Sequence, residues 1–350
     1  MADIAIIQRF LPPTSPGGVG HFTDGLARVL SRRGHRVTVV SQDPGPADAP
    51  YTVERVAMPV SRLAPLRFPW ALRAVDFGRF DVIHAQGDEQ WIRRRGCPPV
   101  VRTMHGTALA EAWFNGVIGR SPKRAAMHLW FYVNEWVAAV RSDALVGVSA
   151  STLTWYPRRG TVIPNGINVA ALRPDGTLKS AYPSVLFVGQ VDSRKRGRLL
   201  IAAMQEVRAQ VPEARLWIVG ADRPGSIQAP GVDVLGPVAD AELRQRLREA
   251  WVMCLPSAYE GFGRPYVEAM AAGTTVVATP NPGAREVLDG GRCGVIADDH
   301  ALAEALVRVL TSSEDRARYV AAGLAQAARY DWDVVAGAYE QVYAQVLERR

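Results

Sequence analysis

The sequence predicts an α/β protein built from two doubly wound, Rossmann-like domains in tandem. Short apolar runs rich in β-branched residues alternate with helical patterns along nearly all of the 350 residues. The runs are near-continuous rather than strictly alternating, which is typical of parallel strands covered on both faces. The length suits two hydrophobic cores, and 48% apolar with 21% charged residues describes an ordinary globular enzyme.

The expected strands fall into two sets. The first set is DIAIIQ, HRVTVVS, FDVIHAQ, PVVRTMH and ALVGVS, and the second is SVLFVGQ, ARLWIVG, VDVLG, WVMCLP, TTVVATP and CGVIA. Between them, residues 172–184 are rich in Pro, Gly and Ser and lack periodicity, which predicts a linker. We therefore expect one domain over 1–171, a second over 185–330, and a last helix over 331–350.

Composition narrows the classes of partner and compartment. A net charge of +7 favours anionic partners, but the basic clusters are short and form no nucleic-acid module, so nucleic acid is not expected. Three widely spaced cysteines give neither a disulfide framework nor a metal knuckle, which favours a reducing cytoplasm. The N-terminus lacks the features of a signal peptide.

The most apolar helical stretch, residues 125–140, is too short and too polar to span a membrane. Its apolar residues surround most of the helix, which favours burial between other elements. The flanking Lys123, Arg124 and Arg141 leave peripheral contact with an anionic membrane as the alternative.

Glycine and polar residues gather where expected strands end. In parallel sheets, ligands bind beyond the carboxyl ends of the strands, so two such sheets facing each other would form a cleft lined by these loops. The residues concerned are Gly17-Gly18, Gly87-Asp88, His105-Gly106 and Gly189-Gln190.

The stretch EGFGRPYVE combines a helix start with two carboxylates eight positions apart, Glu260 and Glu268. Pro265 suits the first turn, and the amides of residues 262–264 would then face an anion. Glu268 follows Arg264 by four residues and shares its helix face. An acidic first turn without a ligand is the alternative that this segment alone leaves open.

Residues 12–43 suggest a dinucleotide-binding unit, since a strand, a glycine loop, a helix and a second strand follow one another. The loop reads Gly18-Val19-Gly20 and has Thr23 where the third glycine is needed for close packing. It is also long and proline-rich. We therefore do not expect a nicotinamide cofactor.

Taken together, the motifs resemble the retaining glycosyltransferases of family four, which have the GT-B fold. The resemblance covers essentially the whole chain through the following segments in order: Gly17-Gly18, RRGHRVTV, HG, VGVSAS, IPNGIN, FVGQVDSRKRG, LGPVADAELRQRLREAWVMCLPS, EGFGRPYVEAMAAGTTVVAT and NPGAREVL. It implies two Rossmann-like domains facing a central cleft. It also implies transfer of a sugar from a nucleoside-diphosphate sugar to an acceptor held by the N-terminal domain.

The resemblance implies roles for individual residues. Glu268 would accept hydrogen bonds from the ribose hydroxyls, and Glu260 would contact the transferred sugar. His105 of the first domain would contact that sugar as well. The catalytic set is then His105, Arg196 and Glu260, and the donor would be bound by Gly17, Gly18, Gly189, Gln190, Lys195, Arg196, Val238, Glu260, Gly261, Phe262, Gly263, Arg264 and Glu268.

One departure concerns the diphosphate. The family usually has arginine directly after the glycine of the FxG motif and lysine six residues later, where this chain has Gln190 and Arg196. Arg194 or Lys195 compensates, or the diphosphate is held with one charge fewer, or the donor differs. The change leaves a sugar-nucleotide epimerase or hydrolase on the same fold as the alternative function.

No metal or cofactor is expected. The sole Asp-x-Asp is Asp331-Trp332-Asp333, which leads into the last helix without a preceding strand and is interpreted as a helix cap. The resemblance implies that cationic side chains and helix dipoles stabilise the leaving group instead. The acceptor stays open among a saccharide, a natural product and a lipid headgroup, because 58–77 and 107–127 match the family least.

Overall fold

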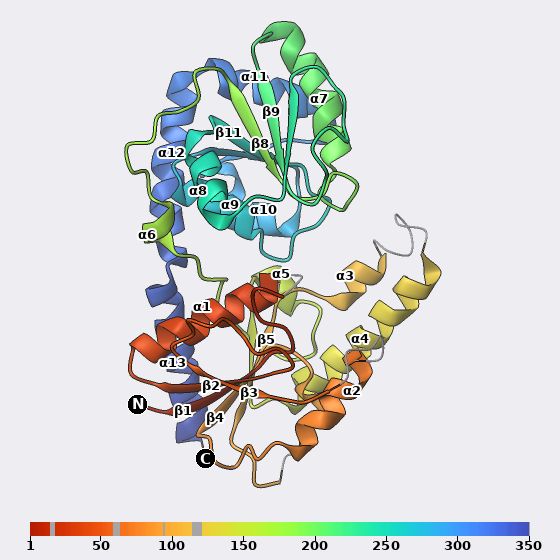
Figure 1. Ribbon diagram of the computed structural model, residues 1–350, viewed down its shortest axis with the longest axis vertical. Helices are drawn as coiled ribbons and strands as arrows, with labels where there is room; N and C mark the ends of the chain where they lie inside the picture. The colour runs from red at the N-terminus through yellow and green to blue at the C-terminus, as the bar shows by residue number, and fades with distance from the viewer. Residues whose placement is uncertain (15–17, 59–63, 94, 114–120, 350) are drawn as a thin grey trace. The chain divides into compact units, whose positions relative to one another are not determined.

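A computed structural model describes residues 1–14, 18–58, 64–93, 95–113 and 121–349 (Figure 1). The chain divides into two compact units. Unit 1 comprises Met1–Gly166 together with Trp332–Arg350, and unit 2 comprises Ile167–Asp331.

The sheet of unit 1 is parallel throughout, with the strand order β3-β2-β1-β4-β5-β6-β7. Its strands are β1 (Asp3–Ile7), β2 (Arg36–Ser41), β3 (Thr52–Arg55), β4 (Val82–Ala85), β5 (Val100–Met104), β6 (Ala144–Gly147) and β7 (Thr161–Val162). All five expected strands form. The edge strands β3 and β7 were not expected from the sequence, because both are short and largely lack buried side chains.

Helices cover this sheet on both faces, as a doubly wound fold requires. They are α1 (Gly18–Arg32), α2 (Ala64–Ala71), η1 (Leu72–Ala74), η2 (Glu89–Trp91), α3 (Ala108–Trp113), α4 (Pro122–Arg141), α5 (Ala150–Leu153) and α13 (Trp332–Glu348). The last helix of the chain belongs to this unit. Buried Tyr339 and Val335 of α13 share one core cluster with Phe22 and Leu26 of α1.

The sheet of unit 2 is also parallel, with the order β10-β9-β8-β11-β12-β13. Its strands are β8 (Ser184–Val188), β9 (Arg215–Val219), β10 (Val232–Gly236), β11 (Val252–Leu255), β12 (Thr275–Ala278) and β13 (Val295–Ile296). The sequence prediction of six strands is confirmed here. The direction of winding reverses between β8 and β11, and ligands bind at such a switch point.

The helices of unit 2 begin before its first strand. They are α6 (Val169–Leu172), α7 (Gly197–Gln210), α8 (Asp240–Glu249), α9 (Arg264–Ala271), α10 (Pro282–Val287), η4 (Asp289–Gly291), η5 (Asp299–Ala301), α11 (Leu302–Thr311), α12 (Ser313–Ala327) and η6 (Ala328–Tyr330).

Residues 172–184, expected to be a linker, lie inside unit 2. The ammonium of Lys179 donates to the carbonyl oxygens of Ala250 at 2.8 Å and Gly273 at 3.0 Å, and to the hydroxyl of Thr274 at 2.8 Å. The indole of Trp251 also donates to the carbonyl of Ser180 at 2.9 Å, so long-range hydrogen bonds fasten a segment that has no periodic pattern. Composition alone does not reveal such an anchor.

The expectation that residues 125–140 are buried is wrong for one face of α4. Leu129, Trp130 and Val133 are each 51% exposed, whereas Ala138 and Ala139 are buried. The helix packs through small and polar side chains, so its large apolar side chains point outward. Within the described residues, no helix is both long and apolar enough to cross a membrane.

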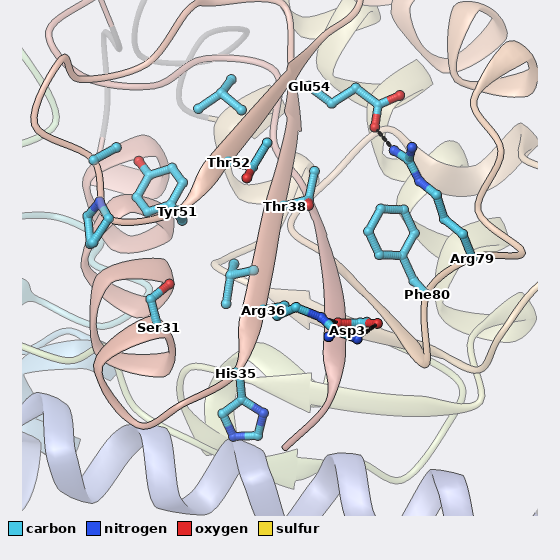
Figure 2. Close-up of a pocket in the computed structure, with 14 residues that line it drawn as sticks. Asp3, Ser31, His35, Arg36, Thr38, Tyr51, Thr52, Glu54, Arg79 and Phe80 are labelled. Atoms are coloured by element: carbon cyan, nitrogen blue, oxygen red, sulfur yellow. Dashed lines mark hydrogen bonds and ion pairs between the residues drawn. The ribbon is translucent and has the colours of Figure 1, made fainter.

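Unit 1 contains a hollow of about 940 Å³, and Figure 2 shows the residues that line it. It lies where β1, β2 and β3 begin, and ion pairs join Asp3 to Arg36 and Glu54 to Arg79 along its wall. This is the amino end of the sheet, opposite to the ends at which parallel sheets bind ligands. None of the residues expected to bind a donor lines it.

Candidate active site

The candidate site in unit 2 is carried by two loops at the switch point. One loop follows β8 and contains residues 189–196, and the other follows β11 and contains residues 256–263. Because β8 and β11 pair side by side, their loops emerge next to each other. This is the place at which an open parallel sheet offers its backbone amides and side chains to a ligand.

Lys195 joins the two expected carboxylates electrostatically. Its ammonium donates to the carbonyl oxygen of Val188 at 2.7 Å. Burial lowers the pKa of Lys195, while the charges of Glu260 and Glu268 act in the opposite direction. Both carboxylates therefore act electrostatically on this ammonium, whereas their ion pairs are formed with Arg194 and Arg264.

Glu260 is held firmly. The residue is 5% exposed, and its Oε1 accepts a hydrogen bond from the hydroxyl of Ser257 at 2.8 Å. The guanidinium of Arg194 forms an ion pair with the same oxygen at 2.8 Å and also donates to the carbonyl of Tyr259 at 2.5 Å. A buried carboxylate with such partners keeps a fixed orientation.

The second carboxylate lies in the first turns of α9. Arg264 donates to Glu268 at 2.7 Å, across one helical turn. Gly263 precedes the helix with φ of 92°, and a Cβ there would lie 2.4 Å from the ring of Tyr266. Only glycine therefore allows this entry into the helix. Phe262 is buried edge-on against Tyr330 at 5.5 Å between ring centres.

Gly189 makes room for Lys195. Its φ is 146°, and a Cβ at this position would lie 2.3 Å from the Lys195 Cδ. The glycine that ends β8 thus lets the lysine fold back over the strand end. Gln190 next to it is exposed, and Val238 is partly buried in the turn that precedes α8.

The guanidinium of Arg196 is held by contacts within unit 2. Its guanidinium donates to the carbonyl of Pro256 at 2.7 Å, to Thr279 at 3.0 Å and to Asp299 at 2.7 and 2.9 Å. These contacts tie the loop after β8 to the segments that follow β11, β12 and β13. Arg196 and Lys195 are neighbours in sequence with different surroundings.

In unit 1, His105 follows β5 and belongs to a polar relay. Its Nε2 lies 2.5 Å from Oε1 of Gln86, and Nε2 of Gln86 lies 3.1 Å from Nε2 of His84. Nδ1 of His84 lies 2.6 Å from the hydroxyl of Tyr343 in α13. A consistent donor direction runs from His105 to Gln86, to His84 and on to Tyr343, with Nε2 of His84 as an acceptor that the hydroxyl of Thr103 also approaches at 2.8 Å.

Both histidines are neutral. Burial lowers the pKa of His84 to about 3, and it lowers the pKa of His105 to about 3 as well, with Arg102 adding a smaller effect in the same direction. The ring of His105 also lies edge-on to Phe22 at 4.8 Å. Sequence reasoning missed Gln86, although it ends the expected strand FDVIHAQ next to other polar strand ends.

The neutral state of His84 predicts acid sensitivity. The unfolded chain takes up a proton on this histidine below about pH 6.5, whereas the folded chain does so only near 3. The contribution of His84 to the free energy of unfolding is therefore fully present above about pH 6.5 and is lost as the pH falls towards 3. We expect the free energy of unfolding, measured in urea between pH 7 and 4, to fall more steeply with decreasing pH in the wild type than in His84→Gln. The difference in slope should be up to about 1.4 kcal/mol per pH unit. Parallel curves would contradict this origin.

The remaining candidates from the sequence are two glycines and the Asp-x-Asp motif. Gly18 begins α1, and Gly17 lies outside the described residues. Asp331 pairs with the backbone of Ile167, and Asp333 lies 3.8 Å from Arg33. In the part of the chain that the structure describes, no group of three or more His, Cys, Asp or Glu side chains could hold a metal ion.

Comparisons with known families cover most of the chain. A family model described as Glycosyltransferase Family 4 matches residues 16–171, and one described as Glycosyl transferases group 1 matches residues 182–312. The phosphatidyl-myo-inositol mannosyltransferase of Mycobacterium leprae is 31% identical, over 95% of this chain and 94% of its own length. That of Mycolicibacterium smegmatis is 32% identical, over 95% and 91%.

Solved structures share the two-unit architecture. Sucrose-phosphate synthase from Thermosynechococcus elongatus superposes with a TM-score of 0.81 at 22% identity over the full length of both chains. The Anabaena protein HepE, solved in complex with UDP and glucose, has a TM-score of 0.74 at 18% identity, over 98% of this chain and 100% of its own. At these identities the likeness shows the fold.

Proposed function

Because this chain belongs to glycosyltransferase family 4 and has the GT-B fold, we propose that it transfers a sugar from a nucleoside-diphosphate sugar with retention of anomeric configuration and without a metal ion. The observation that carries the donor assignment is the pair of anchored carboxylates at the switch point of unit 2, Glu260 beside Arg194 and Glu268 beside Arg264. Retention rests on the family resemblance.

In this proposal the two carboxylates hold opposite ends of the donor. Glu268 accepts hydrogen bonds from the ribose hydroxyls, since an ionised carboxylate offers two acceptor oxygens and no donor. Glu260, oriented by Ser257 and Arg194, accepts hydrogen bonds from the sugar. The amides of residues 262–264 at the start of α9 face the diphosphate between them.

Lys195 takes the role that Arg196 was expected to have. As the bond between the anomeric carbon and the phosphate oxygen breaks, negative charge grows on the diphosphate, and a fixed cation stabilises it most at that moment. Support for this assignment is that Glu260 and Glu268 act electrostatically on Lys195, whereas Arg196 is engaged by Asp299. The loop therefore supplies its charge one residue earlier than the family pattern implies.

A thermal-shift screen with UDP, GDP, ADP and dTDP sugars tests the proposed donor class. One base should raise the unfolding temperature in proportion to its affinity, since a ligand that binds only the folded state stabilises it. HepE, solved with UDP and with UDP-glucose, makes the UDP sugars the first to examine. No shift with any of the four would leave the proposal without support.

The proposed absence of a metal requirement predicts that a chelator leaves turnover unchanged. Lys195, Arg194 and the start of α9 supply the positive potential that a divalent ion supplies in metal-dependent enzymes. Turnover measured with and without EDTA should agree within error. Loss of turnover that Mg²⁺ or Mn²⁺ restores would show that a metal takes part.

Gln190 favours a second candidate function. A neutral side chain stands where the family usually has arginine, and a weaker grip on the diphosphate suits a sugar-nucleotide epimerase or hydrolase on the same fold. The two functions separate by the fate of the sugar. Transfer places the sugar on an added acceptor, whereas the alternative leaves free sugar or an epimerised nucleotide sugar.

The remaining parts of the proposal concern His105 and the cell compartment. We assign neutral His105 a contact with the transferred sugar, supported by the relay through Gln86 that fixes its ring. The odd number of cysteines supports a cytoplasmic location. The acceptor is a saccharide, a natural product or a lipid headgroup bound by unit 1.

A further inference from the structure

The hollow of Figure 2 lies where two neighbouring strands of unit 1 start at different points. Strand β2 pairs with β1 from Arg36 onwards, whereas its pairing with β3 begins only at Thr38, opposite Thr52. The N–H of Arg36 donates to Ala2 on the β1 side, so the N–H of Val37 turns towards the β3 side. No backbone acceptor in the described residues receives it. The start of β2 therefore leaves a gap at the edge of the sheet.

One face of the sheet is polar beside this gap. Because side chains alternate along a strand and paired residues share a face, the residues on this face of β1, β2 and β3 are Asp3, Arg36, Thr38, Thr52 and Glu54. A doubly wound fold ordinarily has apolar side chains on both faces of its sheet. Further along the same strands this is so, since Ala5, Ile7 and Val40 are buried in one core cluster. The apolar side chains of this face thus give way to polar ones at the hollow.

Two polar atoms of the wall lack a partner. The hydroxyl oxygen of Ser31 and Nδ1 of His35 are buried and make no hydrogen bond within the described part of the chain, and both residues line the hollow. Nε2 of His35 lies 3.0 Å from Glu340, whose carboxyl has its pKa lowered by Arg33. The ionised carboxylate only accepts, so Nε2 carries the proton and Nδ1 is an acceptor in the neutral ring. Buried polar groups are ordinarily paired, so these atoms mark positions at which a ligand would gain hydrogen bonds.

The charges at the hollow are balanced. Arg36 pairs with Asp3, and Arg79 pairs with Glu54, so each guanidinium among its described lining residues already has a carboxylate. A phosphate group would meet like charge beside each cation. One ion pair uses only part of the N–H groups of a guanidinium and of the lone pairs of a carboxylate, so both remain able to bind hydroxyl groups. The hollow therefore favours a neutral, hydroxyl-rich ligand over an anion.

A saccharide matches this combination of groups. Each sugar hydroxyl both donates and accepts, and the wall offers the hydroxyls of Thr38 and Thr52 together with the backbone N–H and the imidazole acceptor described above. Tyr51 and Phe80 also line the hollow and supply apolar surface for the C–H groups of a sugar. The volume of about 940 Å³ lies at the upper end of the range for small-molecule sites.

We propose that this hollow is an accessory binding site for a neutral saccharide. Thr38 and Thr52 hydrogen-bond to the sugar, and the ion pairs before and after them along the strands hold its neighbouring hydroxyls. Recognition comes from side chains on the sheet face and from the open strand edge, rather than from the loops at which parallel sheets ordinarily bind ligands. The site shares no residue with the proposed donor site, so it stands or fails independently of sugar transfer.

Saturation-transfer NMR on the full chain tests the proposal with methyl α-glucoside, methyl α-mannoside and maltose as probes. At least one of these should bind to the wild type, and its affinity should fall by at least about tenfold in Thr38→Val/Thr52→Val. Valine keeps the shape and the β-branch of threonine, so the substitutions remove two hydroxyls and little else. The matched control is Thr161→Val on β7, an exposed edge strand of the same unit, where binding should be unchanged.

A second variant keeps the test decisive if the double variant fails to fold. Glu54→Gln exchanges one acceptor oxygen for a donor and should lower the affinity by about threefold to tenfold. Since the ligand is neutral, added salt should leave the affinity of the wild type unchanged, and glucose 6-phosphate should bind no more tightly than glucose. Saturating UDP should not displace the saccharide, because the hollow contains no residue of the donor site.

Three results would overturn the proposal. One is the absence of binding by all three probes, and another is equal binding by the wild type and the variants at the hollow. The third is displacement of the saccharide by UDP, which would place it at the donor site instead. A preference of about tenfold or more for glucose 6-phosphate over glucose, lost in high salt, would show an anion site and contradict the assigned ligand class.

Discussion

Replacing Lys195 with methionine is expected to weaken nucleoside-diphosphate binding by about a hundredfold and to lower the turnover number by a similar factor or more. Methionine keeps much of the apolar stem but removes a charge that interacts electrostatically with both Glu260 and Glu268. Without it, the two carboxylates would face the diphosphate with less opposing charge, and removing one partner of the proposed lysine–diphosphate pair costs about 2–5 kcal/mol. The leaving-group charge that grows in the transition state would also lose a partner.

Arg196→Met is the matched control, because it changes the next residue in the same loop. Its guanidinium is bound to Pro256, Thr279 and Asp299, so its loss should lower the unfolding temperature. Affinity for the diphosphate should stay within about threefold of the wild type. Titration calorimetry on both variants measures the two affinities. A large loss of affinity in Arg196→Met with little change in Lys195→Met would show that Arg196, and not Lys195, binds the diphosphate.

Glu268→Gln is expected to weaken donor binding by about tenfold to a hundredfold, with a smaller effect on the turnover of bound donor. The amide replaces one acceptor oxygen with a donor, which matches a ribose diol poorly, and a hydrogen bond to a charged group contributes about 1.5–3 kcal/mol. Arg264 would also lose its partner at 2.7 Å. Donor affinity and turnover are measured separately to divide the two effects.

Glu249→Gln provides the control for the loss of a helical ion pair. Glu249 pairs with Arg246 at 3.2 Å on α8 of the same unit, and none of the expected donor contacts involves it. Its substitution should leave donor binding unchanged. If Glu268→Gln instead kept its donor affinity while turnover collapsed, Glu268 would belong to the chemistry rather than to binding.

The sequence predicted the fold well because parallel strands buried on both faces leave a strong apolar signal. All eleven expected strands form. The strands it missed, β3 and β7, lie at sheet edges where exposed side chains weaken that signal. Residues 172–184 carry the composition of a linker, yet Lys179 fastens them to unit 2 through three acceptors that are far away in sequence.

The candidate site was predicted in part. The motifs located the loops after β8 and β11 and both carboxylates, because glycine and proline mark such turns clearly. The choice between Lys195 and Arg196 depends on the direction that each side chain takes from adjacent positions, which spacing does not reveal. The relay through Gln86 and the outward face of α4 depend on long-range packing, so no local pattern separates them from ordinary core residues.

A structure of the protein with a bound nucleoside diphosphate would show directly which side chains hold the diphosphate. We expect diphosphate oxygens within hydrogen-bond distance of the Lys195 ammonium and of the amides that begin α9, with the ribose hydroxyls on Glu268. Arg196 should keep its ion pair with Asp299, which it forms at 2.7 Å without the ligand. A diphosphate bound by Arg196 with Asp299 released, or a nucleotide bound away from the β8 and β11 loops, would contradict this expectation.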